Sequence, residues 1–523
     1  MSARTPATDG EPRARRSGRR TSLILVALLI AALSAFSALG YGESLEGADG
    51  RAARAAAATA RSASAGIPVA VFIDSRHHGR RVARDFLGLS FELSSLRQIA
   101  QYAGSGNLIG LLRSLGPGVL RFGGASADSR VAWSDPATAP PPWASELLDA
   151  SDLRRLARLA KDSGWRVLLT LDLAHFQPAL AARETASARA ALGKLLAGIE
   201  LGNEPDAYMR HGLREAPWTF AQYAPQAQAY AAAIAALAPG IPLAGPDVSG
   251  SAAFAGWGGG EAARLQPRLL TGHHYPLGCH QAPAPSIERL LSVATRRAED
   301  ASLDRYMRVA RAARVGFRLD ETNSVSCGGR AGVSDTFASA LWAVSYIARS
   351  MAAGVAGINF HGAVANCRGY APLCAPTPER LESGALSARP EWYALLLAKA
   401  LIGDLPVPTR LAWPGPPGSR ANLSVTALKA PGGRLHLVVV DDDPPGSARV
   451  LLHLHVGRRY GGARILALTA PSPTAGAGVL LGGRSVQSDG SWSEPRTLSR
   501  VSRHRGLIAL AVAPSSALLL TLR

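Results

Sequence analysis

Two glutamates stand in sequence contexts that suit acid–base and nucleophilic chemistry. Glu204 lies in the run Asn203-Glu204-Pro205, and Glu321 directly follows Asp320. Two carboxyl groups that face each other across a sugar can cleave its glycosidic bond with retention, because one attacks the anomeric carbon while the other protonates the leaving oxygen and then activates water. This chemistry requires the two groups to lie about 5–5.5 Å apart. The fold must therefore bring together two positions that are far apart along the chain.

Other polar residues follow apolar runs in the same way. The C-terminal ends of parallel barrel strands meet at one mouth. Polar residues at the end of nearly every run therefore indicate a functional site there, because side-chain packing alone does not explain so many of them. The residues at these positions are Glu92, Asp172, Asn203, Glu204, Asp247, His273, His274, Tyr275, Asp320, Glu321 and His361.

The apolar runs predict the elements that position these residues. Eight short runs have the near-continuous apolar character of buried parallel strands, and segments between them carry helical spacing, for example at 151–164 and 334–354. Eight strand–helix repeats predict an α/β fold, a (β/α)8 TIM barrel, with its active site at the C-terminal strand ends. The runs are 86–92, 118–124, 166–173, 195–204, 242–248, 269–275, 316–321 and 357–362.

The rest of the chain predicts further parts around the barrel. After a last helical run at 390–403, short β-rich runs between Pro/Gly turns indicate a C-terminal all-β sandwich domain. We expect a signal peptide or signal anchor at 1–40, a flexible linker at 41–65, an N-terminal strand that pairs with the β domain at 66–84, the catalytic barrel at 85–395 and the β-sandwich at 396–523.

The amino-terminal segment predicts the compartment. An arginine-rich stretch precedes an uncharged apolar run at 22–40, which is the pattern of a secretory signal or a membrane anchor. We therefore expect an extracellular protein, secreted or anchored to the membrane by this segment.

The charge balance indicates the class of partner. The 523 residues include 57 Lys and Arg against 38 Asp and Glu, a formal net charge of +19. Such a surface favours acidic partners. No basic cluster is interleaved with aromatic residues, so we expect no nucleic-acid partner.

Several segments together resemble glycoside hydrolase family 79, the β-glucuronidase and heparanase family of the clan A retaining glycosidases. The resemblance spans residues 68–523, barrel and β domain together. It implies a retaining hydrolase that cleaves β-linked glucuronic acid from glycans or glycosides, without a cofactor. The segments that carry it are 86–96, 120–128, 201–208, 273–279, 321–343 and 482–492.

The same resemblance implies roles for individual residues. Glu204 would be the general acid/base and Glu321 the nucleophile. Asn203 would bind the sugar 2-hydroxyl, and Glu92, at the end of the first strand, would contact other sugar hydroxyls. Ala125 departs from the family pattern, because some relatives carry a hydroxyl residue there.

A second group of residues would recognise the sugar carboxylate. The family binds that group with tyrosine hydroxyls and backbone N–H donors. The matching positions here are Tyr275, Gly328, Gly329 and Tyr370.

Metal binding is not expected at the histidine pair. His273 and His274 are adjacent on a strand, so their side chains point to opposite faces and cannot readily hold one ion. We expect one of them, His274, to hydrogen-bond at the wall of the sugar site and the other to lie in the core. The run Asp441-Asp442-Asp443 is expected to form a solvated turn rather than a calcium site.

Four cysteines fall in loops expected around the barrel mouth: Cys279, Cys327, Cys367 and Cys374. In an exported protein, the oxidising surroundings would allow them to form two disulfides. Three pairings are possible. Cys279–Cys327 with Cys367–Cys374 is our hypothesis.

Two other functions fit the same residues. Another clan A glycosidase, of the xylosidase or arabinofuranosidase type, would share both glutamates and differ around Tyr275, Gly328 and Tyr370. A non-catalytic, surface-tethered carbohydrate-binding protein would hold a glycan without releasing product.

Overall fold

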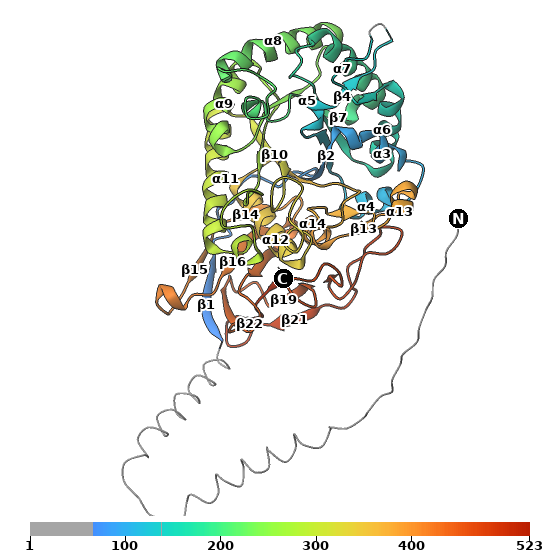
Figure 1. Ribbon diagram of the computed structural model, residues 1–523. Helices are drawn as coiled ribbons and strands as arrows, with labels where there is room; N and C mark the ends of the chain where they lie inside the picture. Colours follow the sequence, from blue (N-terminus) through green and yellow to red (C-terminus); the bar gives the residue numbers. More distant parts are fainter. Residues whose placement is uncertain (1–65, 137–138) are drawn as a thin grey trace, which may run out of the picture. The chain divides into compact units, whose positions relative to one another are not determined.

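The computed structural model describes residues 66–136 and 139–523 (Figure 1). The expected signal or anchor segment and the linker lie outside the described residues. No helix within 66–136 or 139–523 combines the length and apolar character needed to cross a bilayer.

Eight parallel strands close into a barrel in the order β10-β11-β2-β3-β6-β7-β8-β9, which confirms the predicted barrel. Their ends differ from the predicted runs by only a few residues, because the apolar runs are the parts buried on both faces. The strands are β2 (Leu87–Glu92), β3 (Val119–Gly123), β6 (Arg166–Leu171), β7 (Leu196–Leu201), β8 (Leu243–Val248), β9 (Leu269–His274), β10 (Gly316–Thr322) and β11 (Gly357–His361).

Helices and short strands connect and cover the barrel strands. The helices are α3 (Leu96–Gln101), α4 (Leu108–Leu115), α5 (Ser126–Ser129), α6 (Ala150–Ser163), α7 (Pro178–Leu192), α8 (Phe220–Leu237), α9 (Ser251–Arg264), α10 (Ile287–Leu290), α11 (Val293–Ala313), α12 (Phe337–Ala353), α13 (Pro378–Ser383) and α14 (Pro390–Lys399). The short strands are β4 (Val131–Trp133), β5 (Glu146–Leu148), β12 (Leu373–Cys374) and β13 (Ser387–Ala388).

Local sequence signals explain where a typical barrel helix begins and ends. At α6, the Asp149 carboxylate accepts hydrogen bonds from the backbone N–H groups of Ser151 and Asp152. The Asp152 carboxylate in turn accepts one from the Asp149 N–H, which completes a capping box. Gly164 ends the helix with a φ of 77°, a conformation that glycine adopts without steric cost.

The C-terminal domain is a sandwich of two sheets. One sheet has the order β15-β1-β18-β22 and the other β14-β16-β17-β23-β19-β20, with β21 paired to β19. Figure 1 shows the N-terminal β1 among strands from the end of the chain, where it pairs parallel to β18 and antiparallel to β15. The strands are β1 (Ile67–Ile73), β14 (Leu405–Val407), β15 (Thr409–Ala412), β16 (Leu423–Lys429), β17 (Leu435–Asp441), β18 (Val450–His455), β19 (Gly462–Thr469), β20 (Leu480–Leu481), β21 (Ser499–Ser502), β22 (Ile508–Val512) and β23 (Ser516–Leu522).

One sheet of the sandwich also packs against the barrel. Leu437 and Val439 of β17 point into the sandwich core, whereas Val438 and Val440 join the barrel core. This alternation follows from the two-residue period of a strand. Both faces of β17 are therefore buried, and the β domain stabilises the barrel through a shared apolar interface.

The acidic run at the end of β17 corrects an expectation. Asp441 and Asp442 are buried instead of forming a solvated turn. Asp442 pairs with Arg296 of α11 at 3.2 Å, so it links the β domain to the barrel.

Candidate active site

The two glutamates reach the barrel mouth from β7 and β10 by different means. Glu204 follows the end of β7 with a left-handed φ of 48°, and its N–H bonds to the carbonyl of Asp247 in β8. A left-handed conformation is uncommon for a residue with a side chain, and such conformations cluster at functional sites. The backbone therefore aims Glu204 across the mouth.

A bulge in β10 aims Glu321. The pairing of β10 with both neighbouring strands shifts register between Leu319 and Thr322. Consecutive strand residues ordinarily point to opposite faces, but Asp320 and Glu321 both lie against the buried guanidinium of Arg121. The bulge therefore turns two adjacent carboxylates into the barrel, a known use of bulges beside active sites.

His273 lies between the two glutamates. Its Nδ1 is 2.9 Å from Glu204 Oε1 and 3.9 Å from Glu321 Oε1. These two glutamate oxygens are therefore at most about 6.8 Å apart, compared with about 5–5.5 Å for retaining pairs and about 6.5–9.5 Å for inverting pairs. This upper bound includes the retaining spacing and leaves out most of the inverting range.

Arg121, on β3, organises this cluster and was not singled out from the sequence. Its side chain is fully buried, and it contacts Glu321 at 2.5 Å, Asn203 Oδ1 at 2.8 Å and Asp247 at 2.8 Å. It also donates to Glu200 at 3.1 Å. Burial opposes the charge, but the surrounding carboxylates outweigh it and raise the pKa of Arg121 well above its usual value. The cluster therefore contains a permanent cation.

Glu321 is held in its ionised form. Burial opposes ionisation, but His361, His273 and Arg121 outweigh it, and the pKa of Glu321 is strongly lowered. Tyr275 also donates a hydrogen bond to Glu321 Oε1 at 2.8 Å. An ionised carboxylate is the form that can attack an anomeric carbon.

The roles expected of the two adjacent histidines are reversed. His273 faces the site, where Nε2 contacts Asp247 at 2.7 Å; burial opposes its charge, but Glu321, Asp247 and Asp320 raise its pKa. His274 points the other way and packs against the ring of Tyr346 in α12, at 5.5 Å between centroids. Burial, with the charge of Arg349, lowers the pKa of His274 to about 4. The expectation that His274 lines the sugar site is therefore wrong, because strand alternation places His273 there.

The residues expected to bind a sugar carboxylate lie close together beside Glu321. The rings of Tyr275 and Tyr370 stack at 5.7 Å, and their hydroxyls are 3.4 Å apart. The Tyr370 N–H bonds to the Gly328 carbonyl at 3.1 Å, so the loop after β10 positions the loop after β11. Gly329 donates its own N–H to Ser326, and a Cβ on Gly329 would lie 2.4 Å from the Tyr370 nitrogen. Gly329 therefore permits close packing of the two loops.

Glu92 and Asn203 lie at the ends of β2 and β7, and Glu92 Oε1 is 3.9 Å from His361 Nε2. Glu92 accepts a bond from the Ser126 N–H at 2.9 Å, and a Cβ on Gly124 would lie 2.5 Å from its carboxyl carbon. Asn203 Oδ1 is occupied by Arg121, which leaves the Asn203 amide NH2 as a donor for a substrate hydroxyl. A cavity of about 300 Å³ adjoins Asn203; it is lined by Ala125, Asp128, Ser129, Asn203, His211 and Leu213.

Two groups of side chains come close enough together to resemble metal ligands. Asp247, His273 and Asp320 form one. Asp247 accepts hydrogen bonds from Arg121 and His273, and Asp320 Oδ1 accepts from the Gly272 N–H at 2.7 Å. Asp320 Oδ2 has no hydrogen-bond partner among the described residues, but it lies 3.7 Å from Arg121 Nε. The guanidinium of Arg121 therefore supplies the positive charge there.

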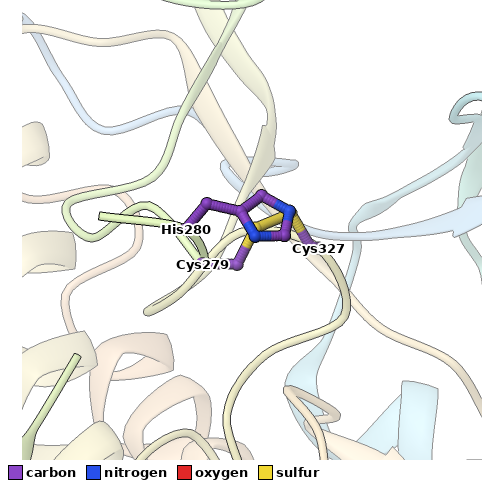
Figure 2. A group of neighbouring side chains, drawn as sticks. All are labelled: Cys279, His280 and Cys327. Atoms are coloured by element: carbon purple, nitrogen blue, oxygen red, sulfur yellow. A yellow bond between two sulfur atoms is a disulfide. The ribbon is translucent and has the colours of Figure 1, made fainter. Parts of the chain in front are cut away.

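The second group is Cys279, His280 and Cys327 (Figure 2). Figure 2 shows the two sulfur atoms bonded to each other, so neither is a thiolate ligand. The other disulfide joins Cys367 and Cys374 within the loop that carries Tyr370. The two disulfides hold the loops after β9, β10 and β11 around the subsite.

Comparison with known proteins gives the fold. No family model matches the chain, and no curated protein matches it. A 4-O-α-L-rhamnosyl-β-D-glucuronidase from Fusarium oxysporum 12S superimposes with a TM-score of 0.68 at 19% identity over 87% of this chain and 100% of the other. A GH51 arabinofuranosidase from Xanthomonas axonopodis pv. citri gives 0.63 at 14% identity, over 87% and 100%. The catalytic domain of GH30 xylanase C from Talaromyces cellulolyticus gives 0.53 at 11%, with the same coverage. The chain thus has a barrel-plus-β-domain fold that occurs among glycoside hydrolases.

Proposed function

We propose that this protein is a retaining glycoside hydrolase that removes β-linked glucuronic acid from glycans or glycosides. The observation that carries the proposal is the placement of Glu204 and Glu321 on either side of His273, with oxygens no more than about 6.8 Å apart.

In the first step, ionised Glu321 attacks the anomeric carbon while Glu204 gives its proton to the leaving oxygen. The glycosidic bond breaks as the bond to Glu321 forms. Asn203, fixed by Arg121, donates to the 2-hydroxyl, an interaction that can strengthen in the transition state.

In the second step, Glu204 takes a proton from water as the water attacks the anomeric carbon. The bond to Glu321 breaks, and the sugar leaves with its original configuration. Glu204 can act in both steps because the His273 contact holds it across the mouth.

The aromatic side of the mouth supports a glucuronide as substrate. Tyr370 and Tyr275 present hydroxyls beside Glu321, and the resemblance to family 79 assigns such tyrosines to the sugar carboxylate. The glucuronidase from Fusarium has the same fold along its full length. We also propose that the protein is exported, because two disulfides suit an oxidising compartment.

Glutamate variants test the catalytic proposal. Glu321→Gln and Glu204→Gln should each lower kcat on an aryl β-glucuronide; for Glu204 the loss should be about 10²–10⁴-fold, the contribution typical of acid–base catalysis. The exposed Glu215→Gln variant is the matched control. Circular dichroism checks that each variant is folded. Near-normal kcat in either active-site variant contradicts the assignment.

Azide rescue separates the two roles. In Glu321→Ala, azide can occupy the vacated space and displace the leaving group once, which gives an α-azide from a β-glycoside. In Glu204→Ala, azide attacks the covalent intermediate and gives a β-azide. The opposite pattern of product anomers would reverse the assignment.

An arabinofuranosidase is a second candidate, because the GH51 enzyme shares the fold with a TM-score of 0.63. Turnover of an aryl α-L-arabinofuranoside, with none of the aryl β-glucuronide, would select it. Glycan binding with no product from any aryl glycoside would instead indicate a carbohydrate-binding protein.

A further inference from the structure

The β domain carries a concentration of cationic side chains away from the catalytic cluster. Two hollows of about 490 and 310 Å³ adjoin each other and share Arg523. Neither hollow is lined by an acidic side chain. We call this region the arginine surface; it consists of Arg434, Arg459, Arg464, Arg500 and Arg523.

The strand register creates an electrostatic conflict within the arginine surface. Arg464 of β19 is the direct cross-strand partner of Arg500 on β21. Like charges in directly opposed positions destabilise a sheet. Only Arg464 has a carboxylate partner, Glu494 at 3.1 Å, among the ion pairs of the described residues. An external anion would relieve the repulsion.

The backbone that carries these arginines is well fixed. Tyr460 is buried, and its hydroxyl bonds to the Gly433 carbonyl at 2.9 Å, which joins the two loops that bear Arg434 and Arg459. The Arg523 N–H bonds to Gly462, and the Gly461 N–H bonds to the Arg523 carbonyl. The arginines therefore project from strand ends and pinned loops rather than from a loose segment.

The composition of the β domain is consistent with an anionic partner. Its basic residues outnumber its acidic residues by more than two to one. Two of those acids, Asp441 and Asp442, are buried against the barrel and do not offset the arginine surface. Guanidinium groups bind carboxylates and sulfates through paired hydrogen bonds.

We propose that the arginine surface binds a polyanionic polysaccharide, through its carboxylate or sulfate groups, at a site separate from the catalytic mouth. The choice of a glycan rests on the proposed function, since a hydrolase of glucuronides would act on chains that carry such groups. The hollows also lack the exposed aromatic platforms on which nucleic-acid bases stack; Tyr460 is buried beneath Arg459, whose guanidinium lies 4.7 Å from the ring centre.

Charge-matched variants test the proposal in the full chain. Arg459→Gln, Arg500→Gln and Arg523→Gln are combined in one protein. The control combines Arg189→Gln, Arg297→Gln and Arg308→Gln, three exposed positions on barrel helices. Affinity electrophoresis through polygalacturonate, heparin or neutral dextran gives Kd at physiological salt. For at least one of the two polyanions, the Kd of the surface variant should be about tenfold or more above that of wild type. The control variant should have a Kd close to that of wild type, and dextran should not retard any of the proteins. Polygalacturonate and heparin distinguish carboxylate from sulfate.

Three outcomes would overturn the proposal: equal loss of affinity in both triple variants, no binding of either polyanion by wild type, or tighter binding of single-stranded DNA than of both glycans. Turnover of the aryl β-glucuronide is measured in parallel and should be unchanged in both variants. Polyanion binding at the surface without turnover would refute the proposed hydrolysis and leave the binding site standing.

Discussion

Arg121 has the largest number of partners of any residue in the proposed chemistry. It contacts Glu321, Asn203 and Asp247 at once, so it links the proposed nucleophile to the residue proposed to bind the 2-hydroxyl. Removing it would leave several buried carboxylates without their cation, which is far more costly than losing an exposed ion pair. The position is therefore intolerant of a neutral residue.

The two tyrosines beside Glu321 should have separable effects. Tyr275→Phe removes a hydrogen bond that lowers the pKa of Glu321, so kcat should fall about tenfold and the acid limb of the pH profile should move to higher pH. Tyr370→Phe should chiefly raise KM for aryl β-glucuronides. Kinetics across pH on glucuronide and glucoside substrates check both.

Tyr393→Phe, in α14, is the matched control, because it also removes a tyrosine hydroxyl that takes part in a hydrogen bond. The Tyr393 hydroxyl accepts this bond from the Val486 N–H. Equal KM for the glucuronide in Tyr370→Phe and wild type would refute a role for Tyr370 in holding the sugar carboxylate.

At the scale of elements, a buried carboxylate aligns the ends of three barrel strands. Asp128 lies in α5, which follows β3, and accepts bonds from the N–H groups of Leu173 and Ala174 after β6. Its second oxygen accepts from the Asn203 N–H at 2.7 Å after β7. Burial, with the nearby charge of Asp172, raises the pKa of Asp128 to about 7. Asp128 is thus a positioning residue for Asn203 and Glu204.

Asp128→Asn should misplace the end of β7. An amide offers one acceptor oxygen where the carboxylate offers two, so an N–H donor would lose its partner at a cost of about 1–3 kcal/mol. We expect kcat to fall about tenfold with a smaller change in KM, and the melting temperature to decrease. Asp304→Asn, the same change at an exposed position in α11, is the control. If the melting temperature falls while kcat is unchanged, Asp128 stabilises the fold but does not position Asn203 and Glu204 for the reaction.

At the scale of the whole molecule, buried carboxyl groups in several elements make the stability of the fold depend on pH. Burial raises the pKa of Glu261 in α9 and of Glu391 in α14 to about 8. Burial and Asp320 do the same for Glu200 in β7. The folded state therefore retains protons that the unfolded chain releases near pH 4, so stability falls as pH rises between these values. His273, with its raised pKa, acts in the same direction.

The melting temperature should accordingly be higher near pH 5 than near pH 9. Glu261→Gln should flatten this dependence, because the amide stays neutral and each pKa difference of this size is worth several kcal/mol at high pH. Calorimetry at a series of pH values measures the slope. Glu215→Gln, at an exposed position, should leave the slope as in wild type, and a slope unchanged by Glu261→Gln would contradict the explanation.

Much of the architecture could be predicted because it depends on local patterns. The buried strands are short apolar runs, and the two-residue period of a strand separates inward from outward positions. The strand ends beside Glu204 and Glu321 were identified for the same reason. The sequence-based assignment placed His274 at the site, where the structure has His273. Strand alternation shows that two adjacent side chains point to opposite faces, but it does not show which of them points into the barrel.

The sequence by itself determined the eight-stranded barrel, the β domain and the pair of glutamates, since composition and spacing along the chain decide these. Only the tertiary structure revealed the role of Arg121, because nothing local distinguishes one arginine among many until carboxylates from β7, β8 and β10 surround it. The bulge that turns Asp320 and Glu321 to one face was likewise decided by pairing with β9 and β11. These features depend on contacts between residues far apart in sequence, which local patterns do not encode.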